Sequence, residues 1–303
     1  MKRKLISFDW AIKRILRSKA NFDILEGFLS ELLKEDIKIL EVLESESNKE
    51  CKEDKYNRLD IKVKNEKEEI ILVEIQYSRE LDYLQRILYA SSKAIVEHIK
   101  EGVSYKGISK IITISILYFN FGDGDDYIYH GTTSFVGIHK KDRLKLTEKQ
   151  QELYKTETVE KLYPEHYLIK VTNFNDYAKD SLDEWINFLK NEEIPEHPKA
   201  KGLEKAKEKL DYLKMSEEEK REYNRHIEEV RRKISEYEST YVVGKIDGKI
   251  EGRIEGIEIG KKEGENKAKI EIAKNALSNG IDIETIILLT GLDKEIIESL
   301  IRK

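Results

Sequence analysis

The residues best placed for chemistry are Asp60, Glu74 and Gln76, which fall in a predicted β-hairpin. Residues 58–64 alternate polar and apolar side chains, and residues 69–77 are rich in Ile and Val, with a polar turn between the two runs. In an antiparallel pair centred on that turn, Asp60 lies opposite Glu74. Because successive side chains of a strand point to opposite faces, Asp60, Glu74 and Gln76 are predicted to share one face.

Two opposed carboxylates favour a bound cation. Directly opposed side chains are about 5 Å apart at Cβ, and carboxylates that close repel each other unless a cation lies between them. Mg²⁺ is an oxygen-seeking ion that fits such a site, and it can bind a phosphate oxygen and activate a water. We therefore expect Asp60 and Glu74 to bind a metal that cuts phosphodiester bonds, with Gln76 orienting the water or contacting the phosphate. The alternative is a solvated acidic pair, but Glu74 lies in an apolar strand where a purposeless charge is costly.

Helices and further strands must position this hairpin. Apolar residues at helical spacing predict helix over residues 7–34, with Ser7 as the N-cap and a break near residues 18–21. A second helix is predicted over residues 81–100, closed by Gly102. Further predicted elements are strands at 37–43, 111–121, 127–138 and 167–171, a polar loop at 44–57 and a helical face at 182–189.

The composition changes after Pro195 and Pro198. We expect a domain over residues 1–195, a charged helical and glycine-repeat segment over 196–267, and a small helical bundle over 268–303. The stretch 199–240 is dense in Lys and Glu and is predicted to be a long solvated helix or coiled coil.

Glycines recur at every fourth position from Gly244 to Gly264, with Ile246, Ile250 and Ile254 beside them. Such a stripe lets a second helix approach closely, which predicts a homodimer through this soluble segment. The alternative is a frayed linker, because each glycine weakens a helix by about 1 kcal/mol.

The last segment predicts short helices joined at Gly280 and Gly291. Its predicted core consists of Ile283, Ile286, Ile287, Leu289, Leu292, Ile296, Ile297 and Leu300. A bundle this small is marginal alone, which favours docking or dimerisation. DNA recognition is the alternative, and acidic residues on the helices disfavour it: Glu284, Asp293, Glu295 and Glu298.

Charge and cysteine content exclude several classes of protein. Charged residues make up 38% of the 303 residues and the net charge is −5, which argues against a broad basic surface that coats nucleic acid. Cys51 is the only cysteine, so neither an internal disulfide nor a cysteine-based zinc site can form. No apolar run approaches the ~20 residues of a membrane span, and no signal sequence follows the basic start. We expect a cytoplasmic protein without a membrane partner.

The motifs together resemble a known family. Arg58-Leu59-Asp60-Ile61 followed by Val73-Glu74-Ile75-Gln76 resembles the PD-(D/E)XK nuclease superfamily, and more closely the Rpn family of recombination-promoting nucleases, also labelled putative transposases. The likeness continues in the opening stretch 9–16, in Arg86-Ile87-Leu88-Tyr89 and in the stretches 102–105 and 111–119. The glycine repeat and Thr290-Gly291-Leu292 resemble the tail of that family. The likeness therefore covers nearly the whole chain.

The resemblance implies an α/β fold: a restriction-endonuclease-like core with a mixed sheet flanked by helices, followed by a helical C-terminal extension. It implies a Mg²⁺- or Mn²⁺-dependent endonuclease that cuts double-stranded DNA, linked to recombination, mobile elements or defence. Asp60 and Glu74 would be metal ligands, and Gln76 occupies the third motif position, where lysine is usual.

The resemblance also adds helix residues to the site. Asp9 would supplement the metal ligands, with Glu26 as an alternative. Arg86 would contact the phosphate or form an ion pair with a nearby acid. The alternative function is a catalytically weak scaffold that binds DNA or a partner, and a third is an RNA-cutting toxin.

Overall fold

The computed structural model describes residues 5–43, 60–99 and 104–301. The chain divides into two compact units, Met1–Ser235 and Glu236–Lys303, and each is described by itself. The three-part domain division predicted from composition stays a prediction. None of the helices in the described ranges combines the length and the apolar character that a membrane span requires.

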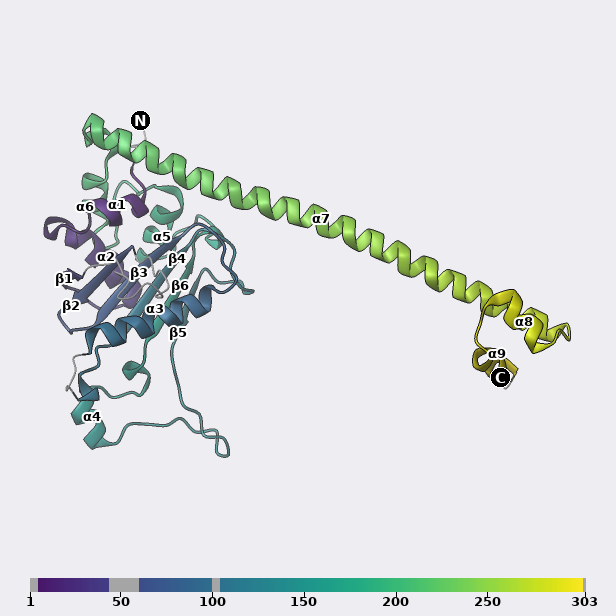
Figure 1. Cartoon of the computed structure of the whole chain (residues 1–303). Coiled ribbons are helices and arrows are strands. Elements are labelled where there is room, and N and C mark those ends of the chain that lie inside the picture. The colour runs from purple at the N-terminus through teal and green to yellow at the C-terminus, as the bar shows by residue number, and fades with distance from the viewer. Residues whose placement is uncertain (1–4, 44–59, 100–103, 302–303) are drawn as a thin grey trace. The chain divides into compact units, whose positions relative to one another are not determined.

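Within the described residues, a mixed six-stranded sheet forms the centre of the first unit (Figure 1). The strand order is β1-β2-β3-β4-β6-β5, in which β3, β4 and β6 are parallel and the outer pairings are antiparallel. The strands are β1 Ile39–Leu43, β2 Ile61–Asn65, β3 Ile70–Gln76, β4 Ile111–Leu117, β5 Ile128–Gly131 and β6 Glu165–Lys170. This sheet confirms the mixed α/β architecture.

The hairpin has the predicted register. Ile61 pairs with Val73 and Lys64 pairs with Ile70. The apolar face of the hairpin is buried in the main core, as strand alternation predicted. The predicted loop at 44–57 and the first residues of the predicted strand, 58 and 59, lie outside the described residues.

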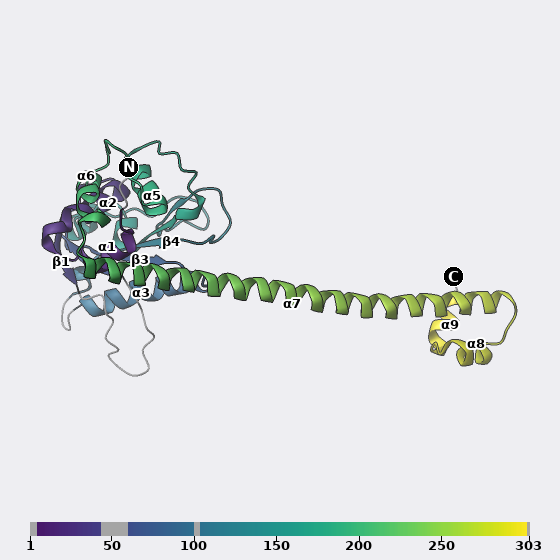
Figure 2. The same ribbon diagram turned by 90° about the horizontal axis from the view of Figure 1, so that it is seen from above.

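Helices cover both faces of the sheet (Figure 2). On one face, Phe8 of α1, Phe28 of α2 and Trp185 of α5 meet edge to face or tilted over the main core. On the other face lies α3, which connects the parallel strands β3 and β4. The helices are α1 Phe8–Arg14, α2 Phe22–Leu33, α3 Tyr83–His98, α4 Glu148–Tyr154, α5 Ser181–Asn191, α6 Leu203–Lys209, α7 Glu217–Ser278, α8 Ile283–Thr290 and α9 Lys294–Ile301.

The N-terminal helices follow the prediction closely. Ser7 caps α1 by accepting a hydrogen bond from the Trp10 amide at 3.5 Å. The predicted break is the short 3₁₀ turn Lys19–Asn21 between α1 and α2. The predicted end of α3 at Gly102 lies outside the described residues.

Strand β5 is shorter than the predicted 127–138. It ends at Gly131, opposite His166, and its partner β6 begins one residue away at Glu165. Beyond this point no strand in the described part of the chain pairs with β5, and Val136 forms an isolated bridge with Arg143.

The prediction of one long solvated helix over 199–240 is wrong. Residues 203–209 form the short helix α6, and α7 begins at Glu217. Leu203 and Ala206 are buried in the main core, because α6 packs closely on α2. A Cβ atom on Gly27 of α2 would lie 2.2 Å from the Lys201 carbonyl oxygen, so only glycine permits this approach.

The second unit contains the glycine repeat and a small helical bundle. The repeat is helical within α7, and a Cβ atom at any of its glycines would meet no atom within 4 Å among the described residues. Gly280 and Gly291 have positive φ and separate the last helices, as predicted. The predicted core is wrong at Leu289 and Ile296, which are exposed. Helix α8 buries the face of Ile286 and Thr290 instead, and α9 buries Ile297.

Candidate active site

Glu74 lies near the carboxyl end of β3 and is 5% exposed. It faces α3, where the Tyr83 hydroxyl donates a hydrogen bond to Glu74 Oε2 at 3.3 Å and Arg86 forms an ion pair with Oε1. Both partners come from the first turn of α3, which starts seven residues after β3 ends. The crossover between parallel strands thus places an arginine and a tyrosine on a buried carboxylate.

The surroundings raise the pKa of Glu74 to about 7. Burial is the largest cause, because it disfavours the charged form. The charge of Asp60 acts in the same direction, whereas Arg86 opposes both. The carboxyl group is therefore close to half ionised at neutral pH without an additional cation.

Asp60 directly precedes β2. Its Oδ2 atom accepts a hydrogen bond from the Ile75 amide at 2.6 Å, which holds the carboxylate beside the residue next to Glu74. Its Oδ1 atom is 3.3 Å from Lys13 Nζ of α1. Burial raises the pKa of Asp60, and Lys13 opposes the rise. The structure thus brings Asp60 to the end of β3 that carries Glu74.

Strand alternation does not account for the orientation of Asp60. The regular pairing of β2 with β3 ends at Ile61, so strand alternation does not fix the face of the sheet to which the Asp60 side chain points. Its side chain contacts α1, whereas the side chain of Glu74 contacts α3. The expectation that strand alternation aligns all three side chains is therefore corrected for Asp60. The Asp60 carboxylate is held near Glu74 by the hydrogen bond that it accepts from the Ile75 amide.

Asp9 does not touch Asp60 directly but shares a lysine with it. Lys13 Nζ is 2.5 Å from Asp9 Oδ1, and His226 Nε2 of α7 is 2.7 Å from Asp9 Oδ2. Among the described residues, no donor is oriented to form a hydrogen bond with either Asp9 oxygen, so the contacts with Lys13 and His226 are classed by distance alone. Burial acts to raise the pKa of Asp9, but His226 and Lys13 outweigh it and hold this pKa below its usual value.

Gln76 is held by a neighbouring acid. Its Nε2 atom donates a hydrogen bond to Glu80 Oε1 at 2.8 Å. Glu80 also accepts two hydrogen bonds from Arg86, at 2.7 and 2.8 Å. Arg86 therefore links Glu74 to Glu80, which bears out the expectation of an ion pair with nearby acids and leaves the phosphate contact a prediction.

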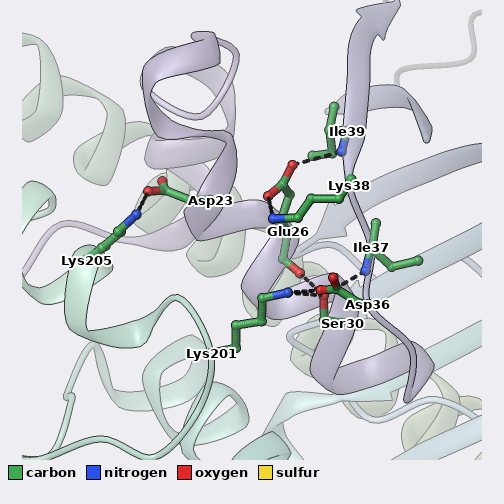
Figure 3. A network of polar contacts seen from close by, with 9 residues as sticks. All are labelled: Asp23, Glu26, Ser30, Asp36, Ile37, Lys38, Ile39, Lys201 and Lys205. Carbon is green, nitrogen blue, oxygen red and sulfur yellow. Dashed lines mark hydrogen bonds and ion pairs between the residues drawn. The ribbon is translucent and has the colours of Figure 1, made fainter. Parts of the chain in front are cut away.

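Glu26, the alternative helix acid, lies elsewhere. Its Oε1 atom accepts a hydrogen bond from the Ile39 amide at 2.9 Å, and Oε2 binds Lys38 at 3.0 Å (Figure 3). The figure shows Glu26 reaching from α2 to the start of β1, within a network that also ties Lys201 and Lys205 to α2 and the turn after it. Glu26 therefore anchors an edge strand.

Sequence reasoning missed the partners that surround the carboxylates. Lys13 is four residues after Asp9 on a helix, so helical spacing could have indicated the pair. Tyr83 and Glu80 follow β3 within the crossover, but their types alone gave no signal. His226 lies 217 residues from Asp9, and no local pattern could have linked them.

Within the described ranges, no group of three or more His, Cys, Asp or Glu side chains has the arrangement of a metal site. The carboxylates instead come as a pair, Asp60 and Glu74. Two carboxylates suit Mg²⁺, which commonly takes one or two protein ligands and completes its shell with waters and substrate phosphate.

Two family models match the chain. The model described as PD-(D/E)XK nuclease family transposase matches residues 6–239, more than half of the chain. The model described as Rpn/YhgA-like nuclease family, C-terminal HTH domain, matches residues 266–301. Comparison with curated proteins and with solved structures gives no match.

Proposed function

The chain belongs to the PD-(D/E)XK nuclease family transposases, and from this premise we propose that it is a divalent-metal-dependent endonuclease that cuts double-stranded DNA. The observation that carries the proposal is the pair of Asp60 and Glu74. Asp60 is bonded to the amide that follows Glu74, and both carboxyl groups have raised pKa values. A cation between them would stabilise the charged carboxylates that burial disfavours.

The donor set fits a hard ion such as Mg²⁺ or Mn²⁺. Asp60 and Glu74 offer carboxylate oxygens at the carboxyl end of β3. When bound, such an ion supplies activation of the attacking water and neutralises charge on the phosphate. Asp9, the further ligand expected from the resemblance, has one oxygen on Lys13 and the other on His226. Asp9 thus holds Lys13 beside Asp60, and its place among the metal ligands stays a prediction from the resemblance.

Lys13 supplies the positive charge that Gln76 cannot. The third motif position normally carries lysine, and Gln76 offers only a neutral amide already bonded to Glu80. Lys13 reaches Asp60 from α1, and the charges of Asp60 and Asp9 raise its pKa against the effect of burial. Its ammonium therefore stays charged and can bind the oxygens of the scissile phosphate. Lys13 also borders a hollow of about 310 Å³ that it shares with Arg14 and Arg225.

Arg86 has a positioning role in this proposal. It fixes Glu74 through an ion pair and is fixed in turn by Glu80. Burial acts to lower the pKa of Arg86, but Glu74 and Glu80 outweigh it and raise this pKa. The guanidinium therefore remains charged beside the site, where it limits repulsion between Glu74 and an incoming phosphate.

Plasmid nicking tests the enzyme proposal. Wild-type protein should relax supercoiled DNA with Mg²⁺ or Mn²⁺ and not with EDTA, and Asp60→Ala and Glu74→Ala should lose this activity. Glu26→Gln changes an acid outside the site and is the control. Cutting that survives both site substitutions would refute the assignment of the carboxylates.

The second candidate function, a DNA-binding scaffold, is favoured by Gln76 alone. Without lysine at the third motif position, the fold could bind DNA without cutting it. DNA binding that no metal converts into cutting would decide for the scaffold. Cutting of RNA but not of plasmid would decide for a ribonuclease.

The glycine repeat supports a homodimer. Ile246, Ile250 and Ile254 are about half exposed beside glycines that have open space around them. A second copy of α7 would cover them. The match of residues 266–301 to a C-terminal HTH domain supports DNA binding by the final bundle, the alternative that its acidic residues had disfavoured. Sedimentation of the full chain should give a dimer, and Ile250→Lys should weaken it. A monomeric wild type would refute the proposal.

A further inference from the structure

A basic, tyrosine-rich groove lies at the end of the sheet opposite to Glu74. It is formed by the segments that precede β3, β4 and β6, namely 67–69, 105–110 and 154–163. These segments meet because the first residues of adjacent parallel strands lie at the same edge. The groove has a volume of about 1040 Å³.

The groove carries more positive than negative side chains. Five lysines and three glutamates line it. Two of the lysines are neutralised, because Lys67 pairs with Glu35 and Lys110 with Glu165. The other three form no ion pair with any residue in the described part of the chain: Lys106, Lys155 and Lys161. Of the acids, Glu68 is paired with a lysine outside the groove. Glu69 and Glu157 form no ion pair within the described part of the chain, so three unpaired lysines face two unpaired glutamates and the groove keeps an excess of positive charge.

Tyrosines alternate with these cations. Tyr105 is 83% exposed, and Tyr154 and Tyr163 are 39% and 38% exposed. Tyr105 adjoins Lys106 in the chain, and Tyr154 adjoins Lys155. Each segment that carries a free lysine thus carries an aromatic ring as well.

Rings for stacking and cations for phosphate are the combination that unpaired nucleic acid requires. A duplex presents no free base faces to the tyrosines, and an acidic peptide has no bases to stack on them. We propose that this groove binds single-stranded nucleic acid, with bases stacked on the tyrosines and phosphates held by the lysines. The inference goes beyond the proposed nuclease activity and does not require cutting.

The groove is a separate subsite. Glu74 lies five residues after Glu69 of the groove, so at about 3.3 Å per residue the groove and the carboxylate site are roughly 16 Å apart. A strand in the groove therefore does not occupy the position of a scissile phosphate.

Fluorescence anisotropy of a labelled oligothymidylate on the full chain, in EDTA and at several salt concentrations, tests the proposal. Tyr105→Ala should weaken binding by between about 5-fold and 100-fold, as expected for one lost base stack. The triple change of Lys106, Lys155 and Lys161 to Gln should reduce the salt slope by about 2, because each phosphate contact contributes about 0.7.

Matched controls make the same changes outside the groove. Tyr177→Ala removes an exposed tyrosine, and the triple control changes three exposed lysines to Gln: Lys140, Lys179 and Lys209. Circular dichroism checks that each variant is folded.

Four results would overturn the proposal: a wild type that does not bind the oligothymidylate, groove variants that behave like the controls, an equal effect of Tyr105→Ala on duplex binding, or stronger competition by polyglutamate than by unlabelled oligothymidylate. Failure of plasmid cutting, with the groove effects intact, would count against the nuclease alone.

Discussion

Replacing Glu74 by Gln should change how stability depends on pH. The pKa of Glu74 is raised from 4.5 to about 7 in the folded chain, so the folded state binds this proton more tightly than the unfolded state does. The resulting stabilisation is complete below about pH 4.5 and is lost as the pH rises through 7. At 1.36 kcal/mol per pKa unit, the loss is about 3 kcal/mol.

The amide that replaces the carboxyl group in the Glu74→Gln variant cannot titrate. The free energy of unfolding of the variant therefore does not fall by this amount as the pH rises through 7. The difference in unfolding free energy between Glu74→Gln and wild type should move by about 3 kcal/mol in favour of the variant between about pH 4.5 and pH 8. Other groups, such as Asp60, titrate in both proteins and largely cancel.

Urea unfolding followed by tryptophan fluorescence measures this difference. The chain has two tryptophans, Trp10 and Trp185, and both are buried in the first compact unit. Added Mg²⁺ should stabilise the wild type at high pH and not the variant, because a ligand that binds only the folded state stabilises it. A difference that stays constant with pH would refute the reasoning about burial and charge at Glu74.

Two further predictions concern Lys13 and the packing of α2. Lys13→Met should lower the single-turnover cutting rate by about 100-fold or more, the usual effect of removing a group that stabilises transition-state charge. Lys13→Arg keeps the positive charge and should retain part of the rate. Equal losses in the two variants would contradict a role for the charge. Gly27→Ala should lower the free energy of unfolding by about 1–3 kcal/mol, because its Cβ atom would meet the Lys201 carbonyl. Thermal unfolding measures this effect, and an unchanged free energy of unfolding would contradict the close approach of Gly27 to Lys201.

Local patterns predicted the sheet and the hairpin well. Alternation and a polar turn were enough for the register of Ile61 with Val73, because a one-residue slip would expose the whole apolar face. The same argument did not hold at Asp60, where the ladder ends and a hydrogen bond to Ile75 sets the side chain instead.

The missing parts of the site depend on contacts between distant segments. Lys13 approaches Asp60 only because α1 packs beside the end of the hairpin. His226 reaches Asp9 only because α7 begins against α1. Likewise, α6 resembles a solvated helix in composition, and the close approach permitted by Gly27 brings it into the core. Such contacts follow from packing and leave no periodic signal.

The most direct test of the central claim is calorimetric titration of Mn²⁺ into the wild type, Asp60→Asn, Glu74→Gln and the control Glu26→Gln. We expect the wild type and the control to bind the ion and both site variants to lose this binding, because Asp60 and Glu74 would form one site. Undiminished binding in both site variants would contradict this expectation.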